Sequence, residues 1–294
     1  MPVSVVIVNY NTFQITCNCI ESVIKHTHSV PYEIIVVDNA STKDNPDEFL
    51  AKFPSVKLIK SSENGGFAKG NNLGIIHAAG DVILLLNSDT ILTEDSISIS
   101  ANKLAELQDA GFITCKLVYE DGTYQHNARA SRSIRNELLD IARPVLMLMP
   151  YKQRATLMLN QHFKGDFNTR CDWVSGAYMM FQKSLLNAMP DNKLDERFFM
   201  YGEDELWCLQ AMKAGYTNYY IKDTTVIHIA NASSEPDKQE RLMKTMLNHS
   251  IEIMRYRFGN GLYFKTLTAI YTFKEQLRFF IKRFVMKIFK YRIR

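Results

Sequence analysis

Short apolar runs alternate with helix-like segments over the first 115 residues of the chain. Strand-like runs rich in valine, isoleucine or leucine occupy residues 3–8, 32–37, 56–59 and 81–86. Residues 13–27 and 67–79 lie between them and suit helices. Such alternation is typical of a parallel sheet with helices on both faces, because strands covered on both faces are apolar throughout. We therefore predict an α/β fold with a mostly parallel sheet flanked by helices.

The rest of the 294-residue chain has a different character. An irregular polar region is followed by an apolar, helix-like stretch at residues 138–149, and order returns with a predicted strand at 173–181 and a predicted helix at 203–214. From residue 238 onward the sequence is mostly helical, with a turn at Gly259-Asn260-Gly261. We predict a body of residues 1–235, divided into halves at 1–115 and 116–235, and a helical C-terminal extension of residues 236–294.

Two classes of protein are disfavoured by simple patterns. No apolar run reaches the roughly eighteen residues that a membrane-spanning helix needs. The first strand follows Met1-Pro2 directly, without the basic start and cleavage site of a signal peptide. The five cysteines are scattered and form no CxxC pair, which favours reduced thiols over disulfides. We expect a cytoplasmic protein.

The C-terminal tail is strongly basic. Residues 265–294 carry nine Lys or Arg and one Glu, a net +8, which leaves the first 264 residues at −4 because the whole chain is +4. An apolar helical stripe is interleaved with cations, at Leu277, Phe280, Ile281, Lys282, Arg283, Phe284, Lys287, Ile288 and Lys290. This pattern predicts attachment to an anionic membrane surface, with docking on the protein's own body as the alternative. The wide apolar face and acidic body argue against nucleic acid.

Two acids follow predicted strands of the sheet. Asp38 comes after residues 32–37 with Asn39 beside it, and Asp89 comes after residues 81–86 with Ser88 beside it. Carboxyl ends of parallel strands meet at one edge, where open α/β sheets bind ligands. Either acid alone could be a turn residue or helix cap. Together they suit a divalent cation that holds a diphosphate.

A glycine-rich turn enters the helix predicted at 67–79. It runs Asn64-Gly65-Gly66-Phe67-Ala68-Lys69-Gly70-Asn71-Asn72. Glycines let backbone approach a ligand, and helix N-termini favour anions. The spacing matches neither the dinucleotide-binding nor the P-loop pattern.

An aromatic run leads into three consecutive acids, Glu203, Asp204 and Glu205. Acids in the first turn of a helix are stabilised by its dipole. A carboxylate packed beside aromatic rings can instead serve as a general base, because burial raises its pKa. His228 ends a strand-like segment, where it is either structural or a metal ligand alongside Asp89.

These segments, taken in order over about residues 3–235, resemble glycosyltransferase family 2, the inverting nucleotide-sugar transferases of GT-A (Rossmann-like) fold. The resemblance rests on Val-Ile-Val-Asn-Tyr-Asn (6–11), Val-Val-Asp-Asn-Ala-Ser (36–41), the glycine turn (64–72), Leu-Leu-Asn-Ser-Asp (85–89), Trp-Val-Ser-Gly-Ala (173–177), Phe-Met-Tyr-Gly-Glu-Asp (199–204) and His228. The style of the motifs is most similar to bacterial rhamnosyltransferases of surface polysaccharide synthesis.

The resemblance implies a role for each motif. It implies that the nucleotide-sugar donor is bound by Asn9, Asn11, Asp38, Asn64, Gly65, Gly66, Phe67, Lys69, Gly70, Asn71, Asn87 and Ser88. Asp89, with His228, would hold Mg²⁺ or Mn²⁺ on the diphosphate, and Asp204, next to Glu203, would be the catalytic base. Trp173, Gly176 and Ala177 would line the acceptor or sugar, although Trp173 suits core packing equally.

Two positions depart from the family pattern. Asn87 stands where many relatives have the first acid of a DxD element, so metal binding depends on Asp89. Leu206 stands where relatives often carry another acid, while Glu205 lies one position earlier, so the base is open among the three acids.

The implied function is metal-dependent inverting transfer of a sugar, such as rhamnose from a dTDP-sugar, to a glycan or lipid-linked acceptor. The enzyme would act as a peripheral protein on the inner face of the cell membrane. The alternatives are a UDP-hexose donor and a nucleotide-sugar-binding protein without turnover. A nucleotidyltransferase is disfavoured, because Asn9-Tyr10-Asn11-Thr12 is not the basic glycine-rich loop expected after its first strand.

Overall fold

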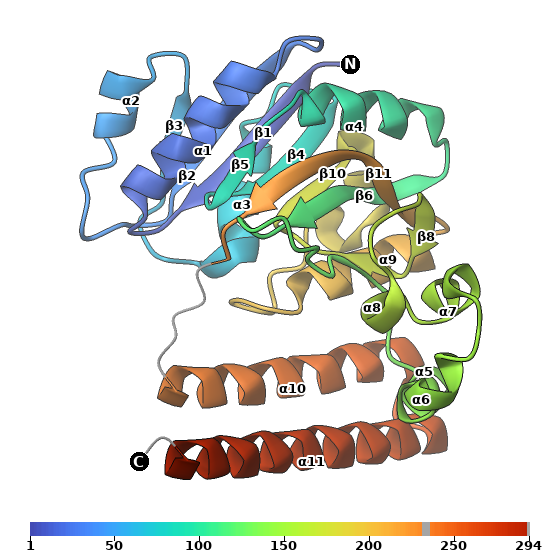
Figure 1. Cartoon of the computed structure of the whole chain (residues 1–294). Helices are drawn as coiled ribbons and strands as arrows, with labels where there is room; N and C mark the ends of the chain where they lie inside the picture. Colours follow the sequence, from blue (N-terminus) through green and yellow to red (C-terminus); the bar gives the residue numbers. More distant parts are fainter. Residues whose placement is uncertain (231–235, 293–294) are drawn as a thin grey trace.

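The computed structural model describes residues 1–230 and 236–292 as a layered α/β body with a pair of long helices beneath it (Figure 1). The strands are β1 (Val3–Asn9), β2 (Tyr32–Asp38), β3 (Lys57–Lys60), β4 (Val82–Asn87), β5 (Thr90–Leu92), β6 (Ala110–Val118), β7 (Ala128–Arg129), β8 (Thr169–Cys171), β9 (Trp173–Val174), β10 (Tyr178–Gln182) and β11 (Thr217–His228). The α-helices are α1 (Phe13–His26), α2 (Glu48–Lys52), α3 (Gly66–Ile76), α4 (Ser96–Glu106), α5 (Ile134–Ile141), α6 (Arg143–Leu146), α7 (Tyr151–Leu157), α8 (Leu159–His162), α9 (Glu203–Lys213), α10 (Pro236–Phe258) and α11 (Leu262–Arg292). Two 3₁₀ segments are η1 (Lys183–Ala188) and η2 (Pro190–Asn192).

Nine strands form the main sheet in the order β3-β2-β1-β4-β10-β6-β11-β5, with β8 beside β11. The first four are parallel, β10 lies antiparallel between β4 and β6, and β11 runs parallel to β6. The predicted α/β fold with a helical C-terminal extension is confirmed. Asn9 is in register with Asp38, and Val8 with Asn87. The ends of β1, β2 and β4 therefore meet at one edge, as parallel strands require.

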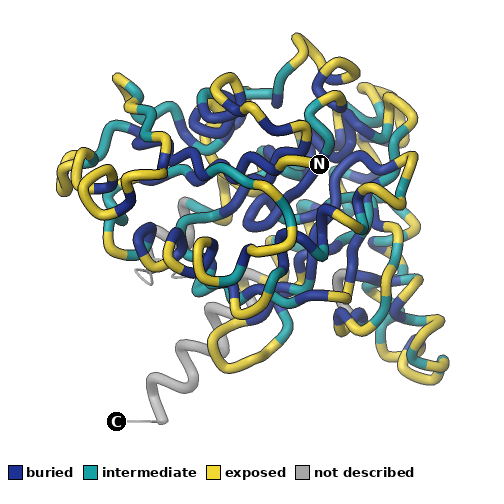
Figure 2. Tube along the Cα trace, turned by 90° about the horizontal axis from the view of Figure 1, so that it is seen from above, coloured by how far each residue is buried: buried dark blue, intermediate teal, exposed yellow. Residues whose placement is uncertain are grey.

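The core lies on both faces of this sheet, because neighbouring residues of each strand point to opposite sides. Val5 and Ile7 of β1 pack with α1 and α4, whereas Val6 packs with α3 and α9. Figure 2 shows the buried chain gathered in the interior and the exposed chain at the periphery. All five cysteines are buried and free.

Two segments are more broken than their patterns indicate. Residues 173–181 form two strands, because β9 pairs with β7 in a separate two-stranded sheet whereas β10 belongs to the main sheet. Ser175-Gly176-Ala177 lie between them and contact α3 and α9. Residues 138–149 form the short helices α5 and α6, and Pro144 lies in the first turn of α6. Proline there lacks the N–H that a continuous helix would need.

The helices α10 and α11 form a hairpin that docks on the body. Ile253 of α10 packs with Leu206 and Leu209 of α9. Leu267 of α11 packs in a cluster that Ile134 of α5 also contacts. No helix within the described residues is long and apolar enough to cross a membrane.

The structure describes only part of the predicted membrane-binding stripe. Leu277 and Phe280 are exposed. The side chains of residues 281–294, which include Ile281, Phe284, Ile288 and the tail cations from Lys282 onward, lie outside the described part of the chain.

Candidate active site

The edge formed by β1 and β2 is built around Asn9 and Asp38. Nδ2 of Asn9 donates to Oδ1 of Asp38 at 2.8 Å. The other carboxylate oxygen of Asp38 accepts the backbone N–H of Ser41 at 3.0 Å, and Asp38 is only 3% exposed. Asp38 thus fixes the loop after β2, and its oxygens keep lone pairs for a further donor.

Asn11 joins the loop after β1 to the loop after β2. It adopts φ 57, in the left-handed region that asparagine tolerates. Its Oδ1 accepts the backbone N–H groups of Thr42 at 2.8 Å and Lys43 at 2.9 Å, and its own N–H donates to Oγ of Ser41. Asn9, Asn11 and Asp38 therefore belong to one hydrogen-bonded unit.

The glycine turn is held between β2 and the aromatic run before α9. Nδ2 of Asn39 donates to Oδ1 of Asn64 at 2.9 Å. Gly66 has φ +81, and the N–H of Phe67 donates to the carbonyl oxygen of Phe199 at 3.0 Å. A Cβ atom on Gly66 would lie 2.1 Å from that oxygen, so only glycine fits.

The remaining residues of the turn brace it. The N–H of Gly65 donates to Oδ1 of Asn39 at 3.2 Å. A Cβ atom on Gly70 would lie 2.9 Å from a methyl group of Val8, so Gly70 allows α3 to approach β1. Asn71 is buried and donates to the carbonyl oxygen of Phe67. Lys69 is exposed and lies 3.4 Å from the carboxylate of Glu63.

At the end of β4, Asp89 faces His228. Nε2 of His228 lies 3.3 Å from Oδ1 of Asp89 and 3.4 Å from Nδ2 of Asn87. Both side chains of the Asp89–His228 pair are partly exposed, and Ser88 lies in the intervening turn, partly buried. Burial alone would raise the pKa of Asp89, but the hydrogen bond and charge of His228 outweigh it, so the pKa is lowered.

Gln125 orients this histidine, and the sequence analysis did not select it. Its Nε2 donates to the backbone oxygen of His228, so its Oε1 faces Nδ1 of the ring at 2.8 Å. The proton therefore belongs on Nδ1, and the lone pair of Nε2 faces Asp89. That arrangement is favourable when a proton or a metal cation binds Nε2, and carbonyl support of this kind is usual for metal-bound histidine.

The Asp89–His228 pair fits a divalent cation that is partly bound by its substrate. No group of three or more His, Cys, Asp or Glu suited to a metal occurs within the described residues. Mg²⁺ sites commonly use one or two carboxylates and take their remaining ligands from phosphate and water. The protein's share here would be Asp89 and His228.

The acids at the start of α9 are largely enclosed. Oδ2 of Asp204 accepts the N–H of Gly176 at 3.2 Å, and Oδ1 accepts the N–H of Glu205 at 2.8 Å. Burial raises the pKa of Asp204, and these hydrogen bonds offset the rise only in part. Burial, followed by the charge of Asp204, raises the pKa of Glu203, whose Oε2 has no hydrogen-bond partner in the part of the chain that the structure describes.

Segment 173–177 connects the acids of α9 to the end of β4 and to the glycine turn. The carbonyl oxygen of Ala177 accepts the N–H of Asn87 at 3.0 Å. A Cβ atom on Gly176 would lie 3.0 Å from the ring of Phe67 and 3.8 Å from Asp204. The predicted donor, metal and base residues therefore border one shared region.

Trp173 is the first residue of this segment, and it contacts Arg129, which the sequence analysis did not select. Trp173 pairs with Arg129 across strands β9 and β7, and the Arg129 guanidinium lies 4.9 Å from its ring. Arg129 also interacts electrostatically with Asp204. Its only sequence signal was a basic residue in the irregular region near residue 130.

Glu205 has a different environment from Asp204. Burial raises its pKa, and the charge of Arg132 is the largest opposing influence. No hydrogen bond joins its side chain to segment 173–177 among the described residues. Of the three acids, Asp204 is the one hydrogen-bonded to the predicted acceptor wall.

Comparisons with known proteins cover different parts of the chain. A family model described as glycosyl transferase family 2 matches residues 4–173. An uncharacterized glycosyltransferase of Bacillus subtilis, YwdF, is 33% identical over 113 residues, which cover 38% of this chain and 41% of that protein. The chain thus spans less than half of that relative.

Two further likenesses extend over more of the chain. An N-acetylglucosaminyl-diphospho-decaprenol L-rhamnosyltransferase of Mycobacterium tuberculosis is 24% identical, with 72% of this chain and 71% of that protein covered. A mannosyltransferase from Pyrobaculum calidifontis, solved with GDP-Man and Mn²⁺, shares 15% identity and a TM-score of 0.58 over 91% of this chain and 68% of that one. The second likeness concerns the fold alone.

Proposed function

The chain belongs to glycosyl transferase family 2, and we propose that it is a metal-dependent inverting glycosyltransferase that uses a nucleotide-sugar donor. One observation carries the proposal. The Asp89–His228 pair and the Asp204 carboxylate border the same region, joined through Gly176 and Ala177. The short segment Gly176-Ala177 thus links the candidate base to the strand end that precedes the candidate metal site, and this link supports the proposal.

The donor would lie along the edge of the sheet. The unit of Asn9, Asn11 and Asp38 would receive the nucleoside, since its asparagines and carboxylate offer polar atoms at the strand ends. The glycine turn would approach the diphosphate with backbone, because its glycines carry no side chain to obstruct contact. Asn87 and Ser88 would complete the floor beside Asp89.

A divalent cation, Mg²⁺ or Mn²⁺, bound at Asp89 and His228 would neutralise charge on the departing nucleoside diphosphate. Gln125 would keep Nε2 of His228 available for such a ligand role, because its Oε1 accepts a hydrogen bond from Nδ1–H. Asn87 in place of a second carboxylate leaves the chain with one anionic ligand, so we expect modest metal affinity.

Asp204 would remove the proton from the acceptor hydroxyl. Its raised pKa brings the carboxylate nearer to the working pH, which favours proton transfer. The N–H of Gly176 holds Oδ2 in a defined orientation toward segment 173–177, which would line the acceptor. The acceptor oxygen then bonds to the anomeric carbon on the face opposite the leaving diphosphate, so the configuration inverts.

For the sugar, we propose rhamnose from a dTDP-sugar, transferred to a lipid-linked glycan acceptor. The support is the likeness to the mycobacterial rhamnosyltransferase over most of this chain. Residues 1–115 would bind the donor, residues 116–235 would bind the acceptor, and residues 236–294 would hold the enzyme at the inner face of the cell membrane. The exposed apolar side chains of Phe273, Leu277 and Phe280 suit such contact.

The test is a panel of dTDP-, UDP- and GDP-sugars, read by thermal shift with Mn²⁺ and then by turnover on the stabilising donor. Asp204→Asn should abolish transfer while the donor still stabilises the protein. Asp81→Asn, an exposed aspartate preceding the opposite end of β4, is the matched control and should behave as wild type. Full transfer by Asp204→Asn, or no stabilisation by any donor, would contradict the proposal.

A further inference from the structure

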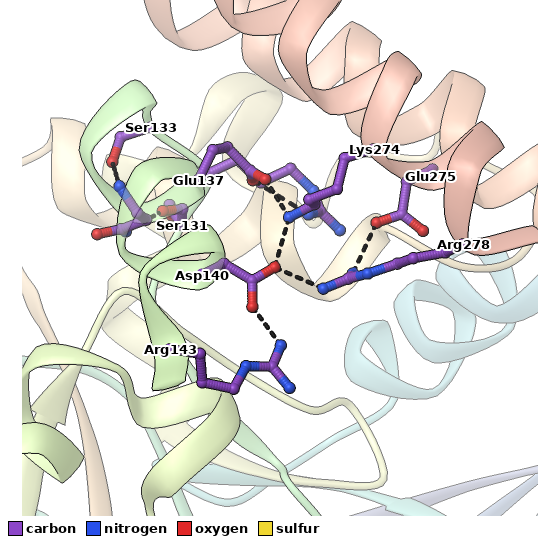
Figure 3. Close-up of polar contacts among 10 residues, drawn as sticks. Ser131, Ser133, Glu137, Asp140, Arg143, Lys274, Glu275 and Arg278 are labelled. Atoms are coloured by element: carbon purple, nitrogen blue, oxygen red, sulfur yellow. Dashed lines mark hydrogen bonds and ion pairs between the residues drawn. The ribbon is translucent and has the colours of Figure 1, made fainter. Parts of the chain in front are cut away.

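A polar cavity of about 370 Å³ lies between β7, α5 and α11, outside the proposed donor site. Its cationic side chains are Arg129, Arg132, Lys274 and Arg278, and its carboxylates are Glu137, Asp140 and Glu275. Figure 3 shows the α5 and α11 part of this group, in which Asp140 lies between Arg143, Lys274 and Arg278.

Two of the cations are fully engaged by these carboxylates. Lys274 pairs with Glu137 and Asp140. Arg278 pairs with Asp140 at 2.5 Å and Glu275 at 2.9 Å. These pairs close one side of the cavity and tie α11 to α5.

Neither of the other two cations forms a hydrogen bond with these carboxylates within the described residues. Arg132 forms an ion pair with Glu137 at 3.6 Å, beyond hydrogen-bond distance, and its buried Nε has no hydrogen-bond partner among the residues described. Its guanidinium is 3.9 Å from the ring of Tyr271. Arg129 donates Nε–H to the carbonyl oxygen of His126 and forms no ion pair within the described residues. Burial lowers the pKa of Arg129, so an anion beside it would offset that cost.

An apolar groove of about 360 Å³ adjoins this cavity between α10 and α11. Arg132 and Glu275 line both spaces. The groove is otherwise built largely from Met243, Met246, Leu247 and the Tyr271 ring. Met243 and Met246 are exposed, so a long apolar chain could reach them from solvent.

We propose that the two spaces together bind the acceptor as an amphiphile, with its phosphate or diphosphate at Arg129 and Arg132 and its hydrocarbon chain in the methionine-lined groove. Planar guanidinium groups bind phosphate oxygens in pairs, and methionine adapts to flexible chains. Arg129 also stacks on Trp173, three residues before Gly176, which holds Asp204. A sugar linked to that phosphate would lie along Trp173 toward the base.

This inference rests on the proposed function, but its test needs no transfer. Farnesyl diphosphate is titrated into the full-length protein with EDTA and saturating UDP, so that the metal-dependent donor site does not take up the diphosphate. Farnesol and inorganic pyrophosphate are titrated in parallel. Binding is read by calorimetry, and Trp173 fluorescence gives a second signal, because Trp207 is fully buried.

Farnesyl diphosphate should bind at least about tenfold more tightly than either fragment, since both halves of the site contribute. Arg129→Gln and Arg132→Lys should each weaken the binding of farnesyl diphosphate and of pyrophosphate by about tenfold, the effect of one charge-assisted hydrogen bond. Met246→Glu should weaken the binding of farnesyl diphosphate and of farnesol but leave the binding of pyrophosphate unchanged. Leu262→Glu, an exposed apolar site outside the groove, is the matched control and should change nothing.

Equal binding of farnesol and farnesyl diphosphate would overturn the phosphate assignment. Unchanged binding in Met246→Glu would overturn the groove assignment. Loss of binding to phosphatidylglycerol vesicles in Arg129→Gln or Arg132→Lys would instead assign the cations to the bilayer surface. If farnesyl diphosphate binds as stated but no sugar nucleotide is turned over, only the proposed function is contradicted. If the donor is hydrolysed but farnesyl diphosphate does not bind, only this inference is contradicted.

Discussion

Nε2 of His228 lies 3.3 Å from Oδ1 of Asp89, and Gln125 holds the opposite nitrogen of the ring. His228 ends β11, and Asp89 lies in the turn between β4 and β5. Strands β11 and β5 pair antiparallel, with His228 opposite Thr90, and this pairing brings the two residues together. Such a pair brings a carboxylate oxygen and a ring nitrogen to one point. The fold, rather than sequence proximity, creates it.

Removing His228, or the Gln125 side chain that orients it, should therefore weaken activation of the enzyme by the metal. We expect His228→Gln and Gln125→Met to raise the Mn²⁺ concentration for half-maximal activity by about 10- to 100-fold, as ligand or supporting-residue losses do elsewhere. The measurement is a Mn²⁺ titration of initial rates at saturating donor. Exposed His77→Gln is the matched control. Wild-type Mn²⁺ dependence in both variants would refute a metal role for His228.

Glu203→Gln should stabilise the protein in alkaline solution. Folding raises the pKa of Glu203, so its stabilising contribution is present below the unfolded pKa of about 4.3 and is lost as pH rises through the folded pKa. At pH 9 the amide should therefore be more stable than wild type by at least about 1.4 kcal/mol, the equivalent of one pKa unit. Urea unfolding at pH 6 and pH 9 measures the difference.

The same variant should affect catalysis through Asp204. Removing a neighbouring negative charge lowers the pKa of Asp204, so the acidic limb of the pH–rate profile should move to lower pH. A limb that stays in place would show that Asp204 titrates independently of Glu203, or that Asp204 is not the base.

Gly66 of the glycine turn and Gly122, in the loop between β6 and β7, form a matched pair. Gly66 and Gly122 have φ +81 and +80, but a Cβ atom would meet the Phe199 oxygen at 2.1 Å only at Gly66. Gly122→Ala should cost about 1–2 kcal/mol, the penalty of left-handed backbone. Gly66→Ala should in addition weaken donor binding by more than about tenfold, measured by calorimetry. Equal donor affinity in the two variants would show that the Phe199 contact does not shape the site.

The edge of the sheet could be predicted from the sequence because it depends on local signals. Asp38 and Asp89 follow apolar strands, and parallel strands necessarily end together. Glycine at 66 and the acids at 203–205 are likewise visible in short windows. Their proximity to one another followed from the family resemblance, and the structure adds the contacts through Gly176 and Phe67.

Gln125 and Arg129 could not be predicted in the same way. Both lie in an irregular region without hydrophobic periodicity, and their positions depend on tertiary contacts with β11 and β9. The apolar stripe toward the end of α11 was also ambiguous, because contact with lipid and contact with protein favour the same sequence pattern. Ile253 and Leu267, near the hairpin turn, pack on the body, whereas membrane contact by the stripe from Leu277 onward stays a prediction.

Asp140→Asn should loosen the attachment of α11 to α5. Burial would raise the pKa of Asp140, but hydrogen bonds and charges from Lys274, Arg143 and Arg278 lower it to about 2. Its contribution is present above the unfolded pKa of about 3.9 and is lost as pH falls through the folded pKa. We expect a loss of about 2 kcal/mol at pH 7 that shrinks toward pH 2, measured by urea unfolding. Glu106→Gln, which breaks an exposed pair with Lys103, should cost less than about 0.5 kcal/mol. A loss in Asp140→Asn that does not change between pH 7 and pH 2 would indicate packing, rather than charge, as the source of the attachment.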